Sequence, residues 1–148
     1  MKQNEQKMLV GALEYCDLPE LDLFKVQMRV DTGATTSSLH VDNIQEFEED
    51  GKRWVSFDIH PDIHNVDTVV SKTLRLKGKK VVKSSTANTE KRIVIKTPIR
   101  MNEREWLIKL TLTDRSSMKN LMLLGREAMK LHILVDPSQE FLVSSDDA

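Results

Sequence analysis

The chain has 148 residues, of which 39% are hydrophobic, so it is long enough for one domain with its own core and too short for two. Its 22 basic and 23 acidic residues nearly cancel, which leaves no large field to attract nucleic acid or an anionic membrane. Cys16 is the only cysteine, so an internal disulfide and a cysteine-rich zinc cluster are excluded. We therefore predict a single domain over residues 1–148, with no nucleic-acid or membrane partner.

The amino-terminal end predicts no targeting or membrane-spanning segment. Residues 1–7 are polar, and the apolar stretch after them is interrupted by Glu14, Asp17 and Pro19. We expect residues 1–8 to be a flexible end. A single cysteine fits a reducing compartment, and we expect a cytoplasmic protein.

The first predicted elements along the chain are strands. Residues 24–30 are a β-prone run. Asp50-Gly51 predicts a two-residue hairpin turn, because both central positions of such a turn need a positive φ. After it, residues 55–59 alternate between apolar and polar side chains, which is typical of a half-buried strand.

The second half of the chain continues this pattern. Residues 74–82 suggest another hairpin that turns at Lys77-Gly78-Lys79, and residues 92–97 predict a strand that Pro98 ends. Residues 106–113 alternate as a long strand, and residues 126–131 form the one helix that we expect. Few helices and frequent turns predict an all-β barrel or sandwich.

Asp31-Thr32-Gly33-Ala34 directly follows the first predicted strand. A strand that delivers an acidic residue into a tight turn is how aspartic peptidases present a catalytic carboxylate. About ninety residues later, the apolar stretch 121–124 runs into Gly125 and a helix-prone segment. Together these two blocks indicate both halves of an aspartic-peptidase core.

Four blocks of sequence carry a resemblance to a known family. They are VDTGATTSSLH at 30–40, LTLTDR at 110–115, MLLGREA at 122–128 and LVDPS at 134–138. The chain resembles the retropepsin-fold bacterial family known as ATP-dependent zinc proteases, which is linked by name to RimK-type glutamate ligases. The resemblance implies an all-β, retropepsin-like closed barrel with one short C-terminal helix.

The resemblance also implies a catalytic centre at Asp31, Thr32 and Gly33. In an aspartic mechanism two carboxylates face one water, and one of them stays protonated as the general acid. Asp31 would supply a carboxylate, Thr32 would anchor the two halves of the site, and Gly33 would let backbone N–H groups approach. Four further residues would support this centre, with Thr35 as a candidate to hydrogen-bond the carboxylate: Ala34, Thr35, Gly125 and Arg126.

No second Asp-Thr-Gly or Asp-Ser-Gly occurs in the chain. The second carboxylate of a conventional aspartic peptidase must then come from another copy of the chain. We predict a two-fold homodimer with Asp31 of each subunit at its axis. A peptide or polypeptide substrate would lie across the cleft as an extended strand.

The family name also raises a zinc-dependent mechanism, for which the candidate ligands are His40, His60 and His64. His60 and His64 are four residues apart, as in helical zinc sites. Pro61, however, biases His60 away from the α region, and no glutamate base stands between them. We expect no cofactor, and zinc remains the alternative. A Gly-rich phosphate loop is absent from the sequence, so any ATP requirement would belong to a partner.

A second function class remains open beside the endopeptidase. The chain would then be a non-catalytic binding or regulatory module that partners a glutamate ligase or its acidic polypeptide product. A locally basic region could face such a product, with a plain solvated strand face as the alternative. It comprises Lys77, Lys79, Lys80, Lys83, Lys91 and Arg92.

Two shorter motifs complete the sequence-based predictions. Lys83-Ser84-Ser85 resembles the family's basic-Ser-Ser motif, but Thr86-Ala87 follows where the family has Asn-Gly, so the role of the Ser84–Asn88 loop is open. Asp136 before Pro137 is most simply a turn residue.

Overall fold

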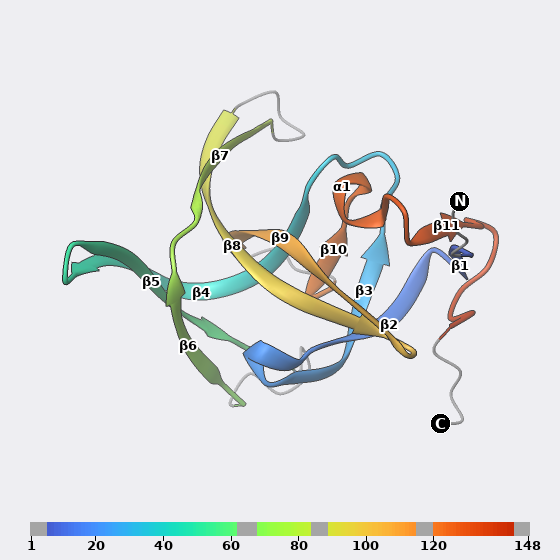
Figure 1. Cartoon of the computed structure of the whole chain (residues 1–148), viewed down its shortest axis with the longest axis horizontal. Helices are drawn as coiled ribbons and strands as arrows, with labels where there is room; N and C mark the ends of the chain where they lie inside the picture. Colours follow the sequence, from blue (N-terminus) through green and yellow to red (C-terminus); the bar gives the residue numbers. More distant parts are fainter. Residues whose placement is uncertain (1–5, 62–67, 84–88, 115–119, 144–148) are drawn as a thin grey trace.

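The computed structural model describes residues 6–61, 68–83, 89–114 and 120–143 of the chain (Figure 1). Almost all of its regular structure is strand, with one 3₁₀ turn and one short helix. In chain order the elements are β1 (Met8–Val10), β2 (Leu13–Leu18), η1 (Pro19–Leu21), β3 (Leu23–Val30), β4 (Ser37–Glu49), β5 (Lys52–Ile59), β6 (Val70–Arg75), β7 (Gly78–Lys83), β8 (Thr89–Met101), β9 (Arg104–Asp114), β10 (Met122–Leu124), α1 (Arg126–Met129) and β11 (Ile133–Val135).

The strands of the main sheet pair into a closed ring. The order β10-β3-β2-β8-β9-β4 returns to β10, because β10 is parallel to β3 on one side and antiparallel to β4 on the other. β5 and β6 extend the sheet beyond β4, and β7 pairs with β8. The parallel pair β1–β11 forms a small second sheet. The predicted all-β class with a short C-terminal helix is confirmed.

One hydrophobic core fills the ring, and the predicted alternation explains it. Phe57 and its apolar neighbours on β5 are buried, as are Ile108, Leu110 and Leu112 on β9, whereas Leu107 on the opposite face is 61% exposed. Side chains of this size each contribute roughly 1.5–3 kcal/mol when they are fully buried. Val10 and Ile133 belong to the same cluster, so the two sheets share one core.

The Asp50-Gly51 turn has the predicted geometry. Both residues have positive φ, 55° and 74°, and β4 pairs with β5 in one register from Glu49 and Lys52 to Gln45 and Ser56. The outer part of this hairpin, with Asp50-Gly51 at its tip, forms an arm that extends away from the ring (Figure 1). The arm therefore lies outside the six-strand ring that carries the Asp31 turn.

The predicted hairpin at residues 74–82 is wrong. β6 pairs with β5 and β7 pairs with β8, so the two strands do not pair with each other. The chain changes partner between Leu76, whose N–H donates to Arg53 of β5, and Lys77, whose N–H donates to Val94 of β8. The apolar pattern correctly predicted two strands, but it carries no information about their partners.

The prediction that Pro98 ends its strand is wrong, because β8 continues to Met101. The carbonyl of Val94 accepts a hydrogen bond from the N–H of Lys77, the residue before β7, and backbone groups of alternate residues point to the same edge of a strand. The nitrogen of Pro98, four residues on without a register shift, therefore faces that edge and away from β9. On this edge of β8, the described pairing with β7 ends at Val94 and the pairing with β2 is at Arg100. Pro98 lies between these two pairings, so its missing N–H costs no hydrogen bond between strands.

Two boundaries also differ from the prediction. The helix ends at Met129 rather than Leu131, where the backbone turns to a positive φ of 71°. Met8 was expected to belong to a flexible end at residues 1–8, but it lies in β1 and its N–H donates to the carbonyl of His132; residues 1–5 lie outside the described part of the chain. No helix within the described ranges has both the length and the apolar composition needed to cross a membrane.

A buried carboxylate fastens the C-terminal segment to the ring. The Glu14 side chain on β2 is fully buried and accepts hydrogen bonds from the backbone N–H groups of Gly11, Leu142 and Val143. Phe141 adds a stacked contact with Tyr15, with ring centroids 4.9 Å apart. The segment around Leu142 is thus held by a polar anchor as well as by packing.

Replacing Glu14 with alanine is expected to destabilise the protein by about 2 kcal/mol, because donors to a charged acceptor lose their partner. Urea unfolding measures this loss, and amide exchange should accelerate at Leu142 and Val143. The matched control Glu20→Ala removes an exposed glutamate and should change stability by less than about 0.5 kcal/mol. Equal effects of the two substitutions would contradict the anchoring role.

Candidate active site

The Asp31 turn connects the end of β3 to the start of β4. The backbone N–H of Asp31 donates to Leu124 of β10 at 2.9 Å, and the carboxylate oxygen Oδ1 accepts from the N–H of Gly33 at 2.9 Å. Asp31 is half-buried, whereas Thr32 and Gly33 are exposed at the tip of the turn. The carboxylate is thus held by its own turn in a position that a ligand can reach.

β10 passes beneath this turn, between the two strands that the turn connects. Its register places Leu124 beside Val30 of β3, and Leu123 beside Ser38 of β4. Gly125 follows directly, and a Cβ on it would lie 2.5 Å from the carbonyl oxygen of Thr36. A glycine is required here by this close approach of two backbones.

Backbone hydrogen bonds fasten the turn to the residues after β10. The N–H of Arg126 donates to Ala34 at 2.8 Å, and the N–H of Glu127 donates to Thr35 at 3.0 Å. The N–H of Gly125 donates to the hydroxyl of Ser37 at 2.9 Å. The residues predicted to support the site, Ala34, Thr35, Gly125 and Arg126, are therefore brought together around the turn.

The guanidinium of Arg126 makes two further bonds to the turn. It donates to the carbonyl of Thr32 at 2.9 Å and to the hydroxyl of Thr35 at 3.0 Å. The hydroxyl of Thr35 thus accepts from Arg126, whereas the expected hydrogen bond to the Asp31 carboxylate, which accepts from Gly33, is not formed. The catalytic roles of Asp31, Thr32 and Gly33 remain predictions.

The histidines considered for zinc lie in different surroundings. A ring nitrogen of His40 is 3.2 Å from the carbonyl oxygen of Asp114, and His60 at the end of β5 is 3.4 Å from the carboxylate of Asp42. His64 lies outside the described residues. Within the described part of the chain, no three histidine, cysteine, aspartate or glutamate side chains gather as metal ligands. The zinc prediction therefore gains no support from the histidines that are described.

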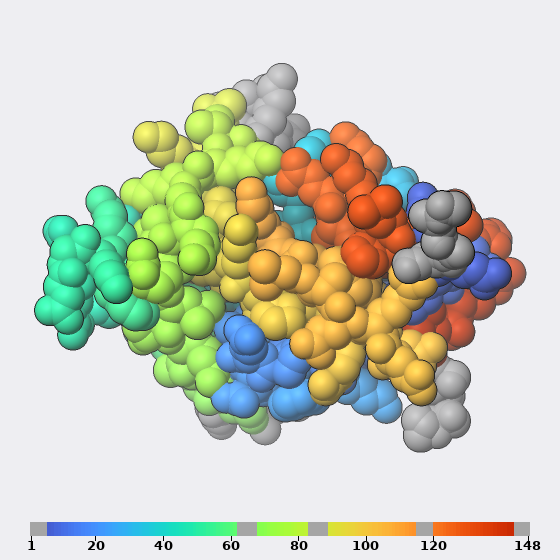
Figure 2. Space-filling view, viewed as in Figure 1, coloured from blue at the N-terminus to red at the C-terminus, as the bar shows by residue number. Residues whose placement is uncertain are grey.

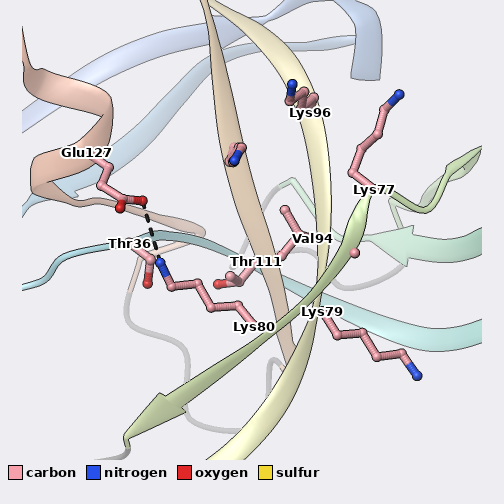
Figure 3. Close-up of a pocket in the computed structure, with 10 residues that line it drawn as sticks. Thr36, Lys77, Lys79, Lys80, Val94, Lys96, Thr111 and Glu127 are labelled. Atoms are coloured by element: carbon pink, nitrogen blue, oxygen red, sulfur yellow. Dashed lines mark ion pairs between the residues drawn. The ribbon is translucent and has the colours of Figure 1, made fainter.

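A lysine-lined hollow adjoins the Asp31 turn. It has a volume of about 370 Å³ and lies where β7, β8 and β9 face Thr36 and α1 (Figure 2). We call it the lysine hollow. Five lysines and one glutamate line it: Lys77, Lys79, Lys80, Lys96, Lys109 and Glu127. Its walls therefore carry an excess of positive charge (Figure 3), and Thr36, in the connection between β3 and β4 that begins with Asp31, forms part of them.

Two of these lysines are paired. Lys79 lies 3.0 Å from Glu46 of β4, and Lys80 lies 3.7 Å from Glu127. The hydrogen bond from Lys79 is the largest effect on Glu46 and holds its pKa below its ordinary value, although burial opposes it; Arg53 adds a smaller lowering effect. For Lys77, Lys96 and Lys109 no carboxylate stands within ion-pair distance among the residues described. Their ammonium groups are available to an anionic ligand.

The sequence-based list of basic residues contained Lys77, Lys79 and Lys80 but missed Lys96 and Lys109. These two lie on β8 and β9, separated in sequence from β7, and the β8–β9 register places them opposite each other. The sequence indicated part of this arrangement, because the alternation over residues 106–113 already placed Lys109 on the face opposite to the buried side chains. Only the pairing of β7 with β8 shows that this face meets the other lysines.

One further prediction concerns a residue near the end of the chain. Asp136 forms the expected turn, with its carboxylate accepting from the N–H and hydroxyl of Ser138, which hold the pKa of Asp136 below its ordinary value. His132 is a packed residue, stacked on Trp106 with centroids 4.3 Å apart. The Ser84–Asn88 loop lies outside the described residues.

A closed ring of strands, with an Asp-Thr-Gly turn that lies over a returning strand and its glycine, defines an all-β protein of the retropepsin-like class. The family comparison agrees with this class. Residues 9–146 match the model of the RimB-like family, described as "Retropepsin-like aspartic endopeptidase RimB", and the chain belongs to that family.

Similar proteins include larger ones. A Desulfotalea psychrophila protein named "Probable alpha-L-glutamate ligase" is 44% identical over 93% of this chain, and a Parasynechococcus marenigrum protein of the same name is 43% identical over 89%. The chain spans about 30% of the length of these relatives, 30% and 28% respectively. A crystal structure of a Legionella pneumophila protein of unknown function (DUF785) matches 94% of the chain and all of that protein, with 28% identity and a TM-score of 0.76.

Gly125→Ala is expected to lower the free energy of unfolding by about 1–3 kcal/mol, because the new Cβ would displace the backbone of Thr36. Chemical denaturation measures the change. Gly33→Ala is the matched control, since its Cβ would approach only the movable carboxylate of Asp31, at 3.2 Å, and should cost less. A larger loss for Gly33→Ala would contradict the tight crossing at Gly125.

Proposed function

We propose that the protein is a retropepsin-like aspartic endopeptidase that uses Asp31 as a catalytic carboxylate. The observation that carries the proposal is the way Asp31 is held: its N–H is bonded to Leu124, and its carboxylate is bonded to the N–H of Gly33 on an exposed turn. Membership of the RimB-like family supports the same chemistry.

The proposed reaction requires two copies of the chain. With one Asp-Thr-Gly per chain, the Asp31 carboxylates of two subunits would face one water across a two-fold axis. The charged carboxylate takes a proton from the water as it attacks the peptide carbonyl, and the protonated one donates to the carbonyl oxygen. Collapse of this intermediate, with a proton passed to the nitrogen, releases the two peptide products.

The proposed substrate is an acidic polypeptide, such as the product of a glutamate ligase. Five lysines surround the hollow beside the Asp31 turn, and an extended chain that enters the site would pass them. The relatives named as glutamate ligases support a glutamate ligase as a functional partner. A ligase of the RimK type and a cytoplasmic location are proposed from the sequence resemblance. Charge attraction of this kind raises the association rate and weakens with salt.

The second candidate is a binding or regulatory module without catalysis. The lysine hollow favours it as much as it favours a protease, because a cluster of ammonium groups can hold an acidic chain whether or not Asp31 acts on it. Peptidase activity distinguishes the two candidates.

Asp31→Asn is expected to lower kcat by a factor of at least about 10²–10⁴, because the general acid–base group is lost while the side-chain shape is kept. The measurement is hydrolysis of a synthetic acidic polypeptide, compared with a neutral one of equal length. Asp50→Asn, in the hairpin turn of the extended arm, is the matched control and should retain activity.

Sedimentation of the wild-type protein tests the shared site. A dimer is expected at the concentrations that support hydrolysis, and mixing wild-type with Asp31→Asn chains should give inactive mixed dimers. Activity from a strict monomer, or unchanged activity of Asp31→Asn, would overturn the proposal.

Removal of metal tests the zinc alternative. Treatment with a strong zinc chelator is expected to leave hydrolysis unchanged, since two carboxylates and a water suffice for the proposed reaction. Protein purified without an affinity tag should contain less than one zinc per active dimer. Loss of activity with the chelator and its return with added zinc would favour the metal-dependent mechanism.

A further inference from the structure

Glu127 is the one acidic side chain among the ten residues that line the lysine hollow. Its carboxylate lies 3.7 Å from the ammonium of Lys80, and the interaction crosses the hollow (Figure 3). Glu127 therefore occupies the kind of position that a carboxylate of an acidic ligand would take.

The two partners of this ion pair belong to opposite walls. The backbone of Glu127 is fixed to the Asp31 turn through its bond to Thr35, and the neighbouring Arg126 side chain bonds the same turn. Lys80 lies on β7, which pairs with β8 and with no other strand in the described sheet. The pair thus connects a fixed wall beside the candidate catalytic residue to an edge strand.

The pair is also weak enough to be exchanged. The side chains of Lys80 and Glu127 remain 41% and 48% exposed, and ion pairs exposed to this degree contribute little because water screens them. Glu127 lines a second, adjacent hollow together with Lys130, so a displaced carboxylate would still face a cation there. Exchange of one carboxylate for another at Lys80 therefore costs little.

We propose that Glu127 is an internal counter-ion, which neutralises Lys80 in the free protein and is displaced by a carboxylate of the bound acidic chain. This inference rests on the proposed acidic substrate and adds how that substrate is selected. A neutral peptide has nothing to exchange for Glu127, so it meets a hollow that is already occupied. An acidic peptide replaces Glu127 at Lys80 and also reaches Lys96 and Lys109.

The experiment measures binding and does not need catalysis. Fluorescently labelled hexaglutamate is titrated at low salt into full-length protein that carries Asp31→Asn, with and without Glu127→Gln. We expect Glu127→Gln to tighten binding about two- to fivefold, because the competing carboxylate is gone. The gain should shrink at high salt, and a hexaglutamine probe should show none.

The matched control is Glu103→Gln, which removes the same charge from the exposed turn between β8 and β9. It should leave hexaglutamate affinity within error, which separates a local effect from the change in net charge. Unchanged or weaker binding by Glu127→Gln, an equal gain in the control, or no binding of hexaglutamate by any variant would overturn the inference. If binding tightens as expected but wild-type protein hydrolyses no peptide, the proposed peptidase function fails and the inference stands.

Discussion

The structure depends on the passage of β10 between β3 and β4 beneath the turn that joins them. β10 closes the ring by pairing with both strands, and its last residue, Leu124, accepts the hydrogen bond from the N–H of Asp31. The two backbones approach so closely that Gly125 leaves no space for a Cβ. Because the same contact closes the ring and holds the Asp31 turn, the fold and the candidate site cannot be separated.

The chain segment after this crossing serves both walls of the candidate site. Arg126 and Glu127 bond the turn through their backbone N–H groups, and their side chains then diverge. The Arg126 guanidinium returns to the turn, whereas the Glu127 carboxylate reaches across the lysine hollow to Lys80. In the proposed function, the first contact positions the catalytic carboxylate and the second adjusts which ligands enter beside it.

The lysine hollow links the two candidate functions to one physical property. Lysines from three strands collect on one surface although the chain is nearly neutral as a whole, with a formal charge of −1. Local charge, rather than net charge, would then govern which polypeptides approach the Asp31 turn. An endopeptidase and a binding module would share this preference and differ only in whether two Asp31 carboxylates meet.

The sequence by itself determined the all-β class, the positive-φ hairpin at Asp50-Gly51 and the Asp31 turn with its distant Gly125 partner, because each depends on local patterning or on residues with special backbone freedom. Two sequence-based predictions were wrong: that β7 pairs with the strand before it, and that Pro98 ends β8. The residues of a strand do not show which strands will lie beside it. Only the tertiary structure decided that Lys96 and Lys109 join the lysines of β7, and that Glu127 faces them. Strand alternation determines which face a side chain takes, whereas the strand order, set by contacts far apart in sequence, determines what that face meets.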